Sequence, residues 1–343
     1  MGLRSYIITR LLLTIPMIML LLSIVFLIVR VLPGDPVLLH FEKFGTPEAI
    51  AAMRHNLGLD KPLVVQYFEY LAGLLRGDFG KSMQDYSSVG QQVFSAFPAT
   101  LELAIFSMLI AVVLGVLLGV RAAKTYNSVQ DHSLRAFGII TYAIPVFFLG
   151  MIFQLIFGIY LHWLPTGGRI FPTMQPSGLT IGSLHFSTGL YTIDSLLEGN
   201  LYKFGQALRY LALPSLTLGL VLCGIFLRLT RTNMLETLRH DYVSAARARG
   251  LREGTVTYGY ALRTAFLPVL TMMGLQFATL LGGAILTETT FSWPGLGRYI
   301  VDRINFRDYT AIQGAVVFFG ILVAFVSLAV DILYAFLDPR IRL

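Results

Sequence analysis

The stretch Leu103-Ala-Ile-Phe-Ser-Met-Leu-Ile-Ala-Val-Val-Leu-Gly-Val-Leu-Leu-Gly-Val120 contains neither a charged residue nor a histidine. A helix of about 17–25 apolar residues crosses the hydrocarbon core of a bilayer. Backbone N–H and C=O groups cannot remain unpaired in lipid, so a stretch of this kind must be helical there. The segment therefore predicts a membrane-spanning helix and an all-α fold.

Five further stretches of similar length lack Asp, Glu, Lys, Arg and His. They are Leu11–Val29, Ala136–Leu161, Tyr210–Leu227, Thr264–Thr287 and Tyr309–Val330. Only 13% of the 343 residues are charged, whereas soluble proteins carry roughly a quarter. We therefore predict a polytopic membrane protein with six transmembrane helices. The first stretch is interpreted as an uncleaved helix, because it is longer than the ~7–15 apolar residues of a signal peptide.

Small residues recur every four positions on three of the predicted helices. The sets are Ala111, Gly115, Gly119 and Ala123; Ser215, Gly219 and Cys223; and Gly274, Ala278 and Gly282. Such stripes let helix backbones approach closely, so they predict a packed bundle. We interpret Cys223, the only cysteine, as a buried small residue, and we expect Pro16 and Pro145 to kink their helices.

Basic residues indicate the orientation. If the N-terminus lies inside, 14 of the 26 Lys and Arg residues fall in cytoplasmic segments. They are Arg4, Arg10, Arg121, Lys124, Arg135, Arg228, Arg231, Arg239, Arg247, Arg249, Arg252, Arg263, Arg340 and Arg342. The opposite orientation would invert the positive-inside bias, so we predict cytoplasmic termini and a cytoplasmic 228–263 loop. Because these residues form no continuous patch, they do not indicate nucleic-acid binding.

The predicted topology divides the chain into three parts. Residues 1–32 form the N-terminal segment and first helix, 33–98 an extracytoplasmic subdomain, and 99–343 the core with a cytoplasmic coupling loop at 231–265. Residues 162–207 and 293–308 also lie outside. Within the subdomain, the Thr46-Pro47-Glu48 start predicts a helix over Thr46–Leu57, and Leu63–Leu75 predicts a second. The Gly-, Ser- and Pro-rich 165–190 segment predicts an irregular loop with a short strand.

The sequence contains no recognisable catalytic or metal-binding motif. No His-Glu-x-x-His or Gly-x-Ser-x-Gly pattern occurs, and Gly80-Lys81-Ser82 lacks the earlier glycine of a phosphate-binding loop. Glu102 and Glu288 lie near the ends of predicted spans, where an acid is either part of a substrate pathway or a satisfied interfacial carboxylate. We therefore predict a conduit rather than an enzyme, with both glutamates as candidate pathway residues.

The cytoplasmic segment Asp241-Tyr-Val-Ser-Ala-Ala-Arg-Ala-Arg-Gly250 lies between two apolar spans. Its alanines favour a helix, and Gly250 is a typical helix stop. A short helix with small residues on one face can be held closely by a partner surface. Leu267-Pro268 then marks the expected cytoplasmic start of the fifth span, where proline is tolerated.

Ser244-Ala245-Ala246-x-x-x-Gly250, followed by Leu267-Pro268, resembles the EAA loop of permease subunits from ATP-binding-cassette importers. The form Tyr242–Leu251 is similar to the version found in the dipeptide/oligopeptide (peptide/nickel) family. Further segments that resemble the first permease subunit of that family are Leu32–Pro36, Leu59–Pro62, Gly77–Gly80 and Thr287–Gly297. One departure is Ser244, which stands where the general loop has Glu, so Arg247 or Arg249 is expected to supply polar contacts.

The resemblance implies a type I importer permease in a bacterial or archaeal cytoplasmic (inner) membrane. It implies a second permease as heterodimer partner, two cytosolic subunits that bind ATP and Mg²⁺, and an extracytoplasmic peptide-binding protein; no cofactor is expected in this chain. The expected coupling residues are Tyr242, Ser244, Ala245, Ala246, Arg247, Arg249, Gly250, Leu251 and Pro268. The implied cargo is di- or oligopeptides, with nickel chelates or glutathione as alternatives. An ion-coupled secondary transporter is disfavoured, because neither a mid-membrane ionisable residue nor a broken helix is evident.

Overall fold

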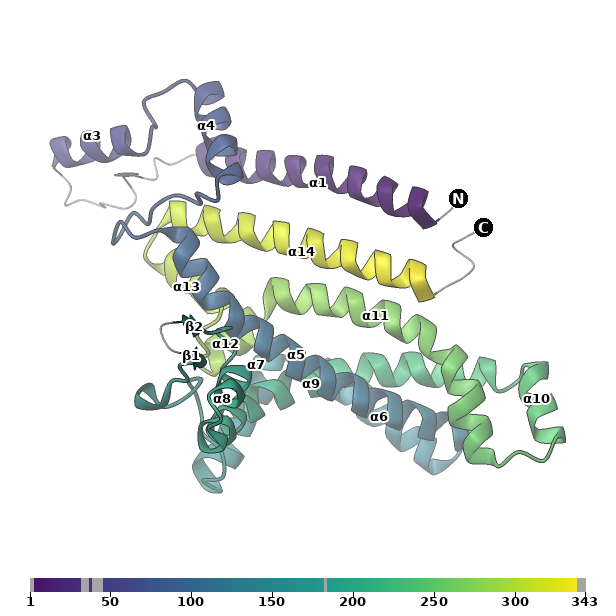
Figure 1. The fold of residues 1–343 in the computed structure, drawn as a ribbon. Coiled ribbons are helices and arrows are strands. Elements are labelled where there is room, and N and C mark those ends of the chain that lie inside the picture. The colour runs from purple at the N-terminus through teal and green to yellow at the C-terminus, as the bar shows by residue number, and fades with distance from the viewer. Residues whose placement is uncertain (1–2, 32–36, 39–45, 182–183, 338–343) are drawn as a thin grey trace.

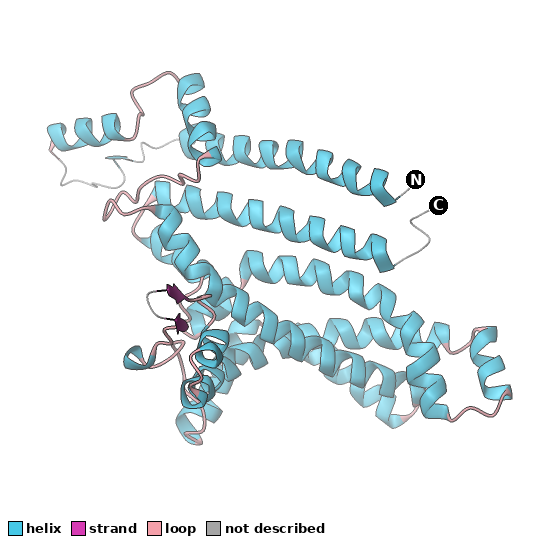
Figure 2. Ribbon diagram, viewed as in Figure 1, coloured by secondary structure: helices cyan, strands magenta, loops and turns pink. Residues whose placement is uncertain are grey.

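The structure is a computed structural model that describes residues 3–31, 37–38, 46–181 and 184–337 (Figure 1). The regular structure of the described chain is helical, apart from one hairpin of two short strands, and loops connect these elements (Figure 2). The predicted all-α fold is thus confirmed. The motif Leu32–Pro36 and the basic residues Arg340 and Arg342 lie outside the described residues.

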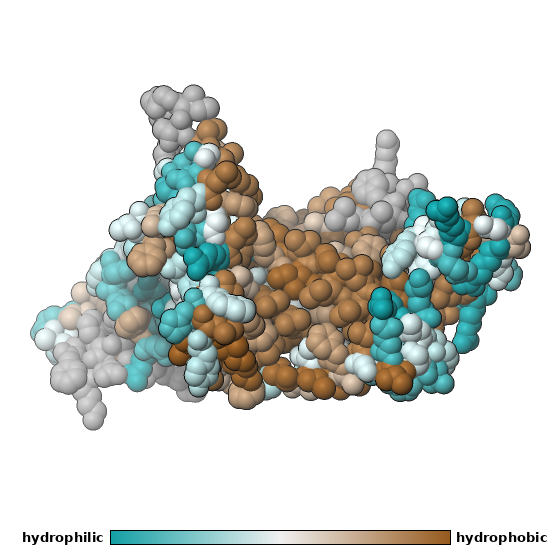
Figure 3. Space-filling view, turned by 90° about the horizontal axis from the view of Figure 1, so that it is seen from below, coloured by the Kyte–Doolittle hydropathy of each residue, from teal (hydrophilic) through white to brown (hydrophobic). Residues whose placement is uncertain are grey.

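Five helices are long and apolar enough to cross a membrane, and a bent pair of helices makes a sixth span. The spans are α1 (Leu3–Val31), α5 (Val89–Lys124), α6 (Val129–Ala143) with α7 (Val146–Phe153), α9 (Leu201–Thr237), α11 (Leu262–Gly283) and α14 (Tyr309–Leu337). Figure 3 shows an apolar belt across the middle of the molecule, with hydrophilic residues gathered at both ends. The six-span prediction is confirmed.

The elements outside the spans gather at the two ends of the bundle (Figure 1). The helix α10 (Asp241–Ala248) lies at the end where α1 begins and α14 ends. The opposite end carries α3 (Pro47–Asn56), α4 (Leu63–Leu75), η2 (Pro172–Met174), β1 (Leu179–Ile181), β2 (Leu184–Phe186), α8 (Tyr191–Leu197), α12 (Ile285–Thr290) and α13 (Leu296–Asn305). This arrangement agrees with the predicted topology, in which the loop containing α10 and both termini share one side.

The two predicted subdomain helices are present as α3 and α4. Thr46 caps α3 by accepting a hydrogen bond from the backbone N–H of Ala49 at 3.3 Å. The expected strand in 165–190 is the antiparallel pair β1 and β2, with Leu179 opposite Phe186. Helix α5 begins at Val89, so the predicted division between residues 98 and 99 falls inside a continuous helix.

The third span is broken, which corrects two expectations. Instead of a kink at Pro145, α6 and α7 are separate helices that meet at an angle of 100°, and a π-helical segment η1 (Gln154–Tyr160) follows them. Proline has no N–H to donate and forces the preceding residue out of the helical region, and Ile144 is accordingly extended at φ −72°, ψ 127°. The expectation that no span is broken was therefore wrong.

Pro268 was wrongly placed at the start of the fifth span. The helical run begins at Glu253 and passes through the π-helical segment η3 (Thr255–Ala261), and Pro268 lies inside α11. The charge of Arg263 marks the edge of the apolar stretch, but a long basic side chain can reach the interface while its helix continues. The position of Arg263 therefore marks the edge of the apolar stretch, but it does not mark the start of the helix.

The centre of the bundle is the contact between α5 and α9, and small residues are necessary there for the two helices to approach so closely. A Cβ atom at Gly115 would lie 2.5 Å from Cβ of Phe226, and one at Gly119 would lie 2.7 Å from Cβ of Thr230. From the other helix, a Cβ at Gly219 would lie 2.8 Å from Cβ of Ile110. The stripes predicted from the sequence are thus confirmed as close helix contacts.

Candidate functional site

The predicted cytoplasmic helix is present as α10 and ends as expected. Asp241 lies in its first turn, and Gly250 has φ +76°, a conformation that L side chains rarely adopt. The N–H of Gly250 donates to the carbonyl of Arg247 at 2.9 Å, and that of Leu251 donates to the carbonyl of Ala246 at 3.4 Å. Gly250 thus closes the last turn of α10.

One face of α10 packs into the bundle. Val243 and Ala246 are fully buried in a cluster formed by the ends of three membrane helices and by η3. The buried partners are Val120 and Ala123 of α5, Met234 of α9, Val256 and Ala261 of η3, and Ala265 of α11. Tyr242 adds a hydrogen bond from its hydroxyl to Oγ1 of Thr264 at 3.0 Å. A displacement of α10 would therefore act directly on α5, α9 and α11.

The opposite face of α10 is open. Ser244, Ala245 and Ala248 are exposed, as is Arg249 beyond the helix end, whereas Leu251 is half-buried. Arg247 forms an ion pair with Glu253, with 2.8 Å between Nε and Oε1. The sequence groups Ala245 with Ala246, but in the structure Ala246 is buried and Ala245 is exposed.

Glu102 is held in a buried ion pair at the end of the bundle opposite α10. Its Oε2 lies 2.7 Å from Nη2 of Arg169, and its Oε1 accepts hydrogen bonds from the N–H and hydroxyl of Thr192, both at 2.7 Å. Arg169 also lies over the ring of Tyr191 at 3.8 Å and donates to the carbonyl of Gly189 at 2.7 Å. The side chains of Glu102 and Arg169 are only 3% and 6% exposed. Glu102 thus connects α5 to the loop that contains Arg169 and to the first turn of α8.

Glu288 lies in a second buried network, in the helix α12. It accepts hydrogen bonds from the hydroxyl of Thr100 at 2.6 Å and from the N–H of Arg298 at 3.0 Å. Burial raises the pKa of Glu288, and these hydrogen bonds partly offset that effect. A Cβ atom at Gly295 would lie 2.3 Å from Oε1 of Glu288, so the glycine leaves room for the carboxylate. Trp293 donates from Nε1 to a carbonyl of α5 at 2.8 Å. Segment 287–297 therefore locks α12 and α13 onto α5.

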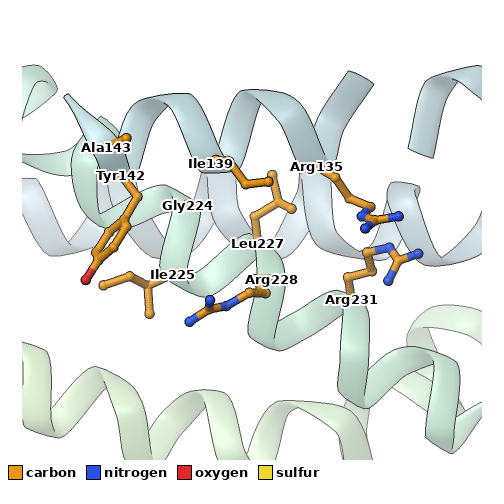
Figure 4. A pocket seen from close by; sticks show the side chains of 10 residues that line it. Arg135, Ile139, Tyr142, Ala143, Gly224, Ile225, Leu227, Arg228 and Arg231 are labelled. Atoms are coloured by element: carbon orange, nitrogen blue, oxygen red, sulfur yellow. The ribbon is translucent and has the colours of Figure 1, made fainter. Parts of the chain in front are cut away.

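A groove of about 400 Å³ runs along α6 and α9 (Figure 4). Its walls are largely apolar and include Ile139, Tyr142, Ile225 and Leu227, and its basic residues are Arg135, Arg228 and Arg231. Arg231 is neutralised by Asp131, with distances of 2.6 and 2.7 Å between paired nitrogen and oxygen atoms. Sequence reasoning missed this site, because Asp131 and Arg231 are 100 positions apart and carry no local signal.

Among the described residues, no group of three or more His, Cys, Asp or Glu side chains could hold a metal ion.

Comparison with known proteins matches both parts of the chain to one kind of system. Residues 112–343 match the family of binding-protein-dependent transport system inner membrane components, and residues 3–104 match the N-terminal region of such membrane components. The sequence is 41% identical over 339 residues to the di/tripeptide transport system permease protein DppB of Pseudomonas aeruginosa (strain UCBPP-PA14), covering 98% of each chain. It is 38% identical over 339 residues to the dipeptide transport system permease protein DppB of Escherichia coli (strain K12), covering 98% of each. It is also 38% identical over 338 residues to the glutathione transport system permease protein GsiC of Salmonella choleraesuis (strain SC-B67), covering 98% of this chain and 99% of that protein.

Proposed function

The chain belongs to the family of binding-protein-dependent transport system inner membrane components, and on this premise we propose that it imports di- or oligopeptides under the control of its helix α10. It is an inner-membrane permease subunit of the peptide branch of ATP-binding-cassette importers, and ATP hydrolysis belongs to partner subunits. Relatives named for di- or tripeptides, dipeptides and glutathione all share 38–41% identity with it. Glutathione is therefore an alternative cargo, and nickel chelates are a second alternative that the resemblance to the peptide/nickel family implies.

The observation that carries the proposal is the two-sided construction of α10. One face is buried against α5, α9 and α11, while the other exposes Ser244, Ala245 and Ala248 at the cytoplasmic end of the predicted topology. A partner that grips the open face would move three membrane helices together. The proposed partners are a second permease, two cytosolic ATPases and an extracytoplasmic peptide-binding protein. ATP binding would favour one of two arrangements of the bundle, and hydrolysis would release it.

Co-purification and energy dependence test this proposal. The tagged chain is expected to bring down two ATPase subunits and a second permease, and peptide uptake by cells that express the system should stop when ATP is depleted. An ion-coupled transporter would need no ATPase. If no ATPase co-purifies and uptake survives ATP depletion, the proposed function is wrong.

Gly250→Val is expected to uncouple ATP hydrolysis from uptake. A β-branched side chain at φ +76° costs about 1–3 kcal/mol of strain, so the last turn of α10 should unwind. Nothing lies within 4 Å of the added Cβ, so membrane insertion should be unaffected. Uptake of labelled peptide and ATPase activity of the purified complex are the two measurements, and uptake should fall at least several-fold while hydrolysis continues.

Gly254→Val is the matched control for this experiment. Gly254 lies in the same loop with equally open surroundings, but its φ of −60° suits any residue. In this control, ATP hydrolysis should drive peptide uptake as it does in the wild type. Normal uptake in Gly250→Val, or equal losses in both variants, would show that the geometry of Gly250 is not needed for coupling.

A further inference from the structure

The groove between α6 and α9 lies beside the break in the third span. Tyr142 and Ala143, which line it, form the last turn of α6, and the chain then passes through Ile144 and Pro145 into α7. The last carbonyls of α6 and the first N–H groups of α7 have no partner within a helix, and no side chain caps α7. Irregular backbone at membrane depth is tolerated against protein or water and not against lipid. Although α7 packs on α9 and α12, the residues Tyr142, Ala143 and Pro145 around the break are exposed, so we infer that a protein partner covers this face or that it lines an aqueous path.

The charges of the groove are not balanced within the described chain. Of its three arginines, only Arg231 forms an ion pair with a described carboxylate, and that carboxylate, Asp131, is 1% exposed. Arg135 and Arg228 are exposed. Figure 4 shows Arg228 directed past Ile225 on α9, whereas Arg135 lies beside Arg231 at the other end of the groove. The groove thus carries two exposed guanidinium groups beside largely apolar walls.

We propose that the α6–α9 groove is a carboxylate-binding site on the translocation path, in which Arg228 binds the C-terminal carboxylate of the peptide and Arg135 adds a second positive charge. The inference rests on the proposed import of peptides. Guanidinium groups bind carboxylates through charge-assisted hydrogen bonds. The side walls, including Ile139 and Ile225, offer apolar contact without hydrogen-bond readout. A free carboxylate is common to peptides of every sequence, so these residues bind the one group that all such cargoes share.

Uptake by the complete transporter tests the proposal. Both permeases, the ATPases and the peptide-binding protein are reconstituted in liposomes with an unmodified dipeptide as cargo. The double variant Arg135→Gln/Arg228→Gln should lower uptake at least about tenfold, because a hydrogen bond to a charged group is commonly worth that much. Lysine at both positions keeps the charge and should restore most of the uptake.

Arg263→Gln is the control for the positive-inside alternative. Arg263 is an exposed arginine on the same side of the predicted topology, and it does not line the groove. If Arg135 and Arg228 served only to orient the chain, the three positions would behave alike. Equal uptake in the double variant and in Arg263→Gln would overturn the inference.

Cysteine labelling gives a readout that does not depend on transport. Ile225→Cys is made in a Cys223→Ser background, which removes the only native cysteine, and the complete transporter is treated with anionic and cationic thiosulfonates of equal size. The anionic reagent should react faster, Arg228→Gln should abolish that preference, and free dipeptide should slow labelling more than its amidated form. Absence of labelling from water would mean that lipid or a partner helix fills the groove, and the inference would be wrong.

The two proposals fail in different ways. If the wild-type transporter imports no peptide, the proposed function is wrong. If the wild type imports peptide but the groove variants match Arg263→Gln and the labelling of Ile225→Cys shows no charge preference, the proposed function stands and the carboxylate site is wrong.

Discussion

Glu102→Ala should destabilise the protein by about 3–5 kcal/mol, because it leaves the charge of Arg169 buried without its partner. Arg169 would keep its contact with Tyr191 and its bond to the Gly189 carbonyl, but neither neutralises a guanidinium. The N–H and hydroxyl of Thr192 would also lose their acceptor. Thermal unfolding of the purified complex in mild detergent measures the loss.

Two further variants separate a structural role for Glu102 from a role in the substrate pathway. Glu69→Ala removes an ion pair with Lys61, in which the Glu69 side chain is 53% exposed and that of Lys61 is 45% exposed. Because the pair is exposed, the loss of folding free energy should be at most about 1 kcal/mol. Glu102→Met/Arg169→Met replaces the buried pair by apolar side chains and should recover most of the stability. If Glu102→Ala unfolds like Glu69→Ala and only peptide uptake falls, Glu102 belongs to the pathway instead.

Gly115→Val should separate the two central helices and cost about 3 kcal/mol or more of folding free energy. The first added carbon would lie 2.5 Å from Cβ of Phe226, 3.0 Å from the carbonyl oxygen of Cys223 and 3.1 Å from the amide nitrogen of Leu227. None of these atoms is the free end of a flexible side chain, so α5 and α9 must move apart. The expected result is a low yield of folded complex and an early unfolding transition in detergent.

Gly205→Val is the control for helix propensity. Gly205 lies in α9, the helix that α5 packs against, but no atom lies within 4 Å of a Cβ added there. Replacing glycine inside a helix without a clash is neutral or stabilising by a few tenths of a kcal/mol. A Gly115→Val protein as stable as Gly205→Val would mean that the α5–α9 contact is not tight, contrary to the stripe of small residues.

Much of the fold could be predicted because it depends on local chemistry. Charge-free stretches predicted six spans, Thr46 predicted the start of α3, and Gly250 predicted the end of α10. The errors arose where a local signal had two possible results. A proline such as Pro145 can kink a helix or break it, and the neighbours that decide between these outcomes are distant in sequence.

The candidate site was only half visible in the sequence. The position of α10 followed from charge, helix propensity and a glycine stop, yet the sequence could not show that Ala246 points inward while Ala245 points outward. From the sequence, the candidate substrate-pathway residues are the acids near the ends of predicted spans, Glu102 and Glu288. The structure gives Glu102 and Glu288 hydrogen-bonding partners within the chain, whereas Arg135 and Arg228 in the α6–α9 groove form no ion pair within 4.0 Å among the described residues.

The sequence by itself determined the membrane class, the number of spans, the stripes of close helix contact and the place of α10, because hydropathy, small-residue spacing and helix-ending residues act over a few positions. Only the tertiary structure decided which charges are paired. Glu102 meets Arg169 across 67 positions and Asp131 meets Arg231 across 100, and such pairs form when separate helices dock. An ionisable residue is therefore a structural tie or a free binding group according to its neighbours in space.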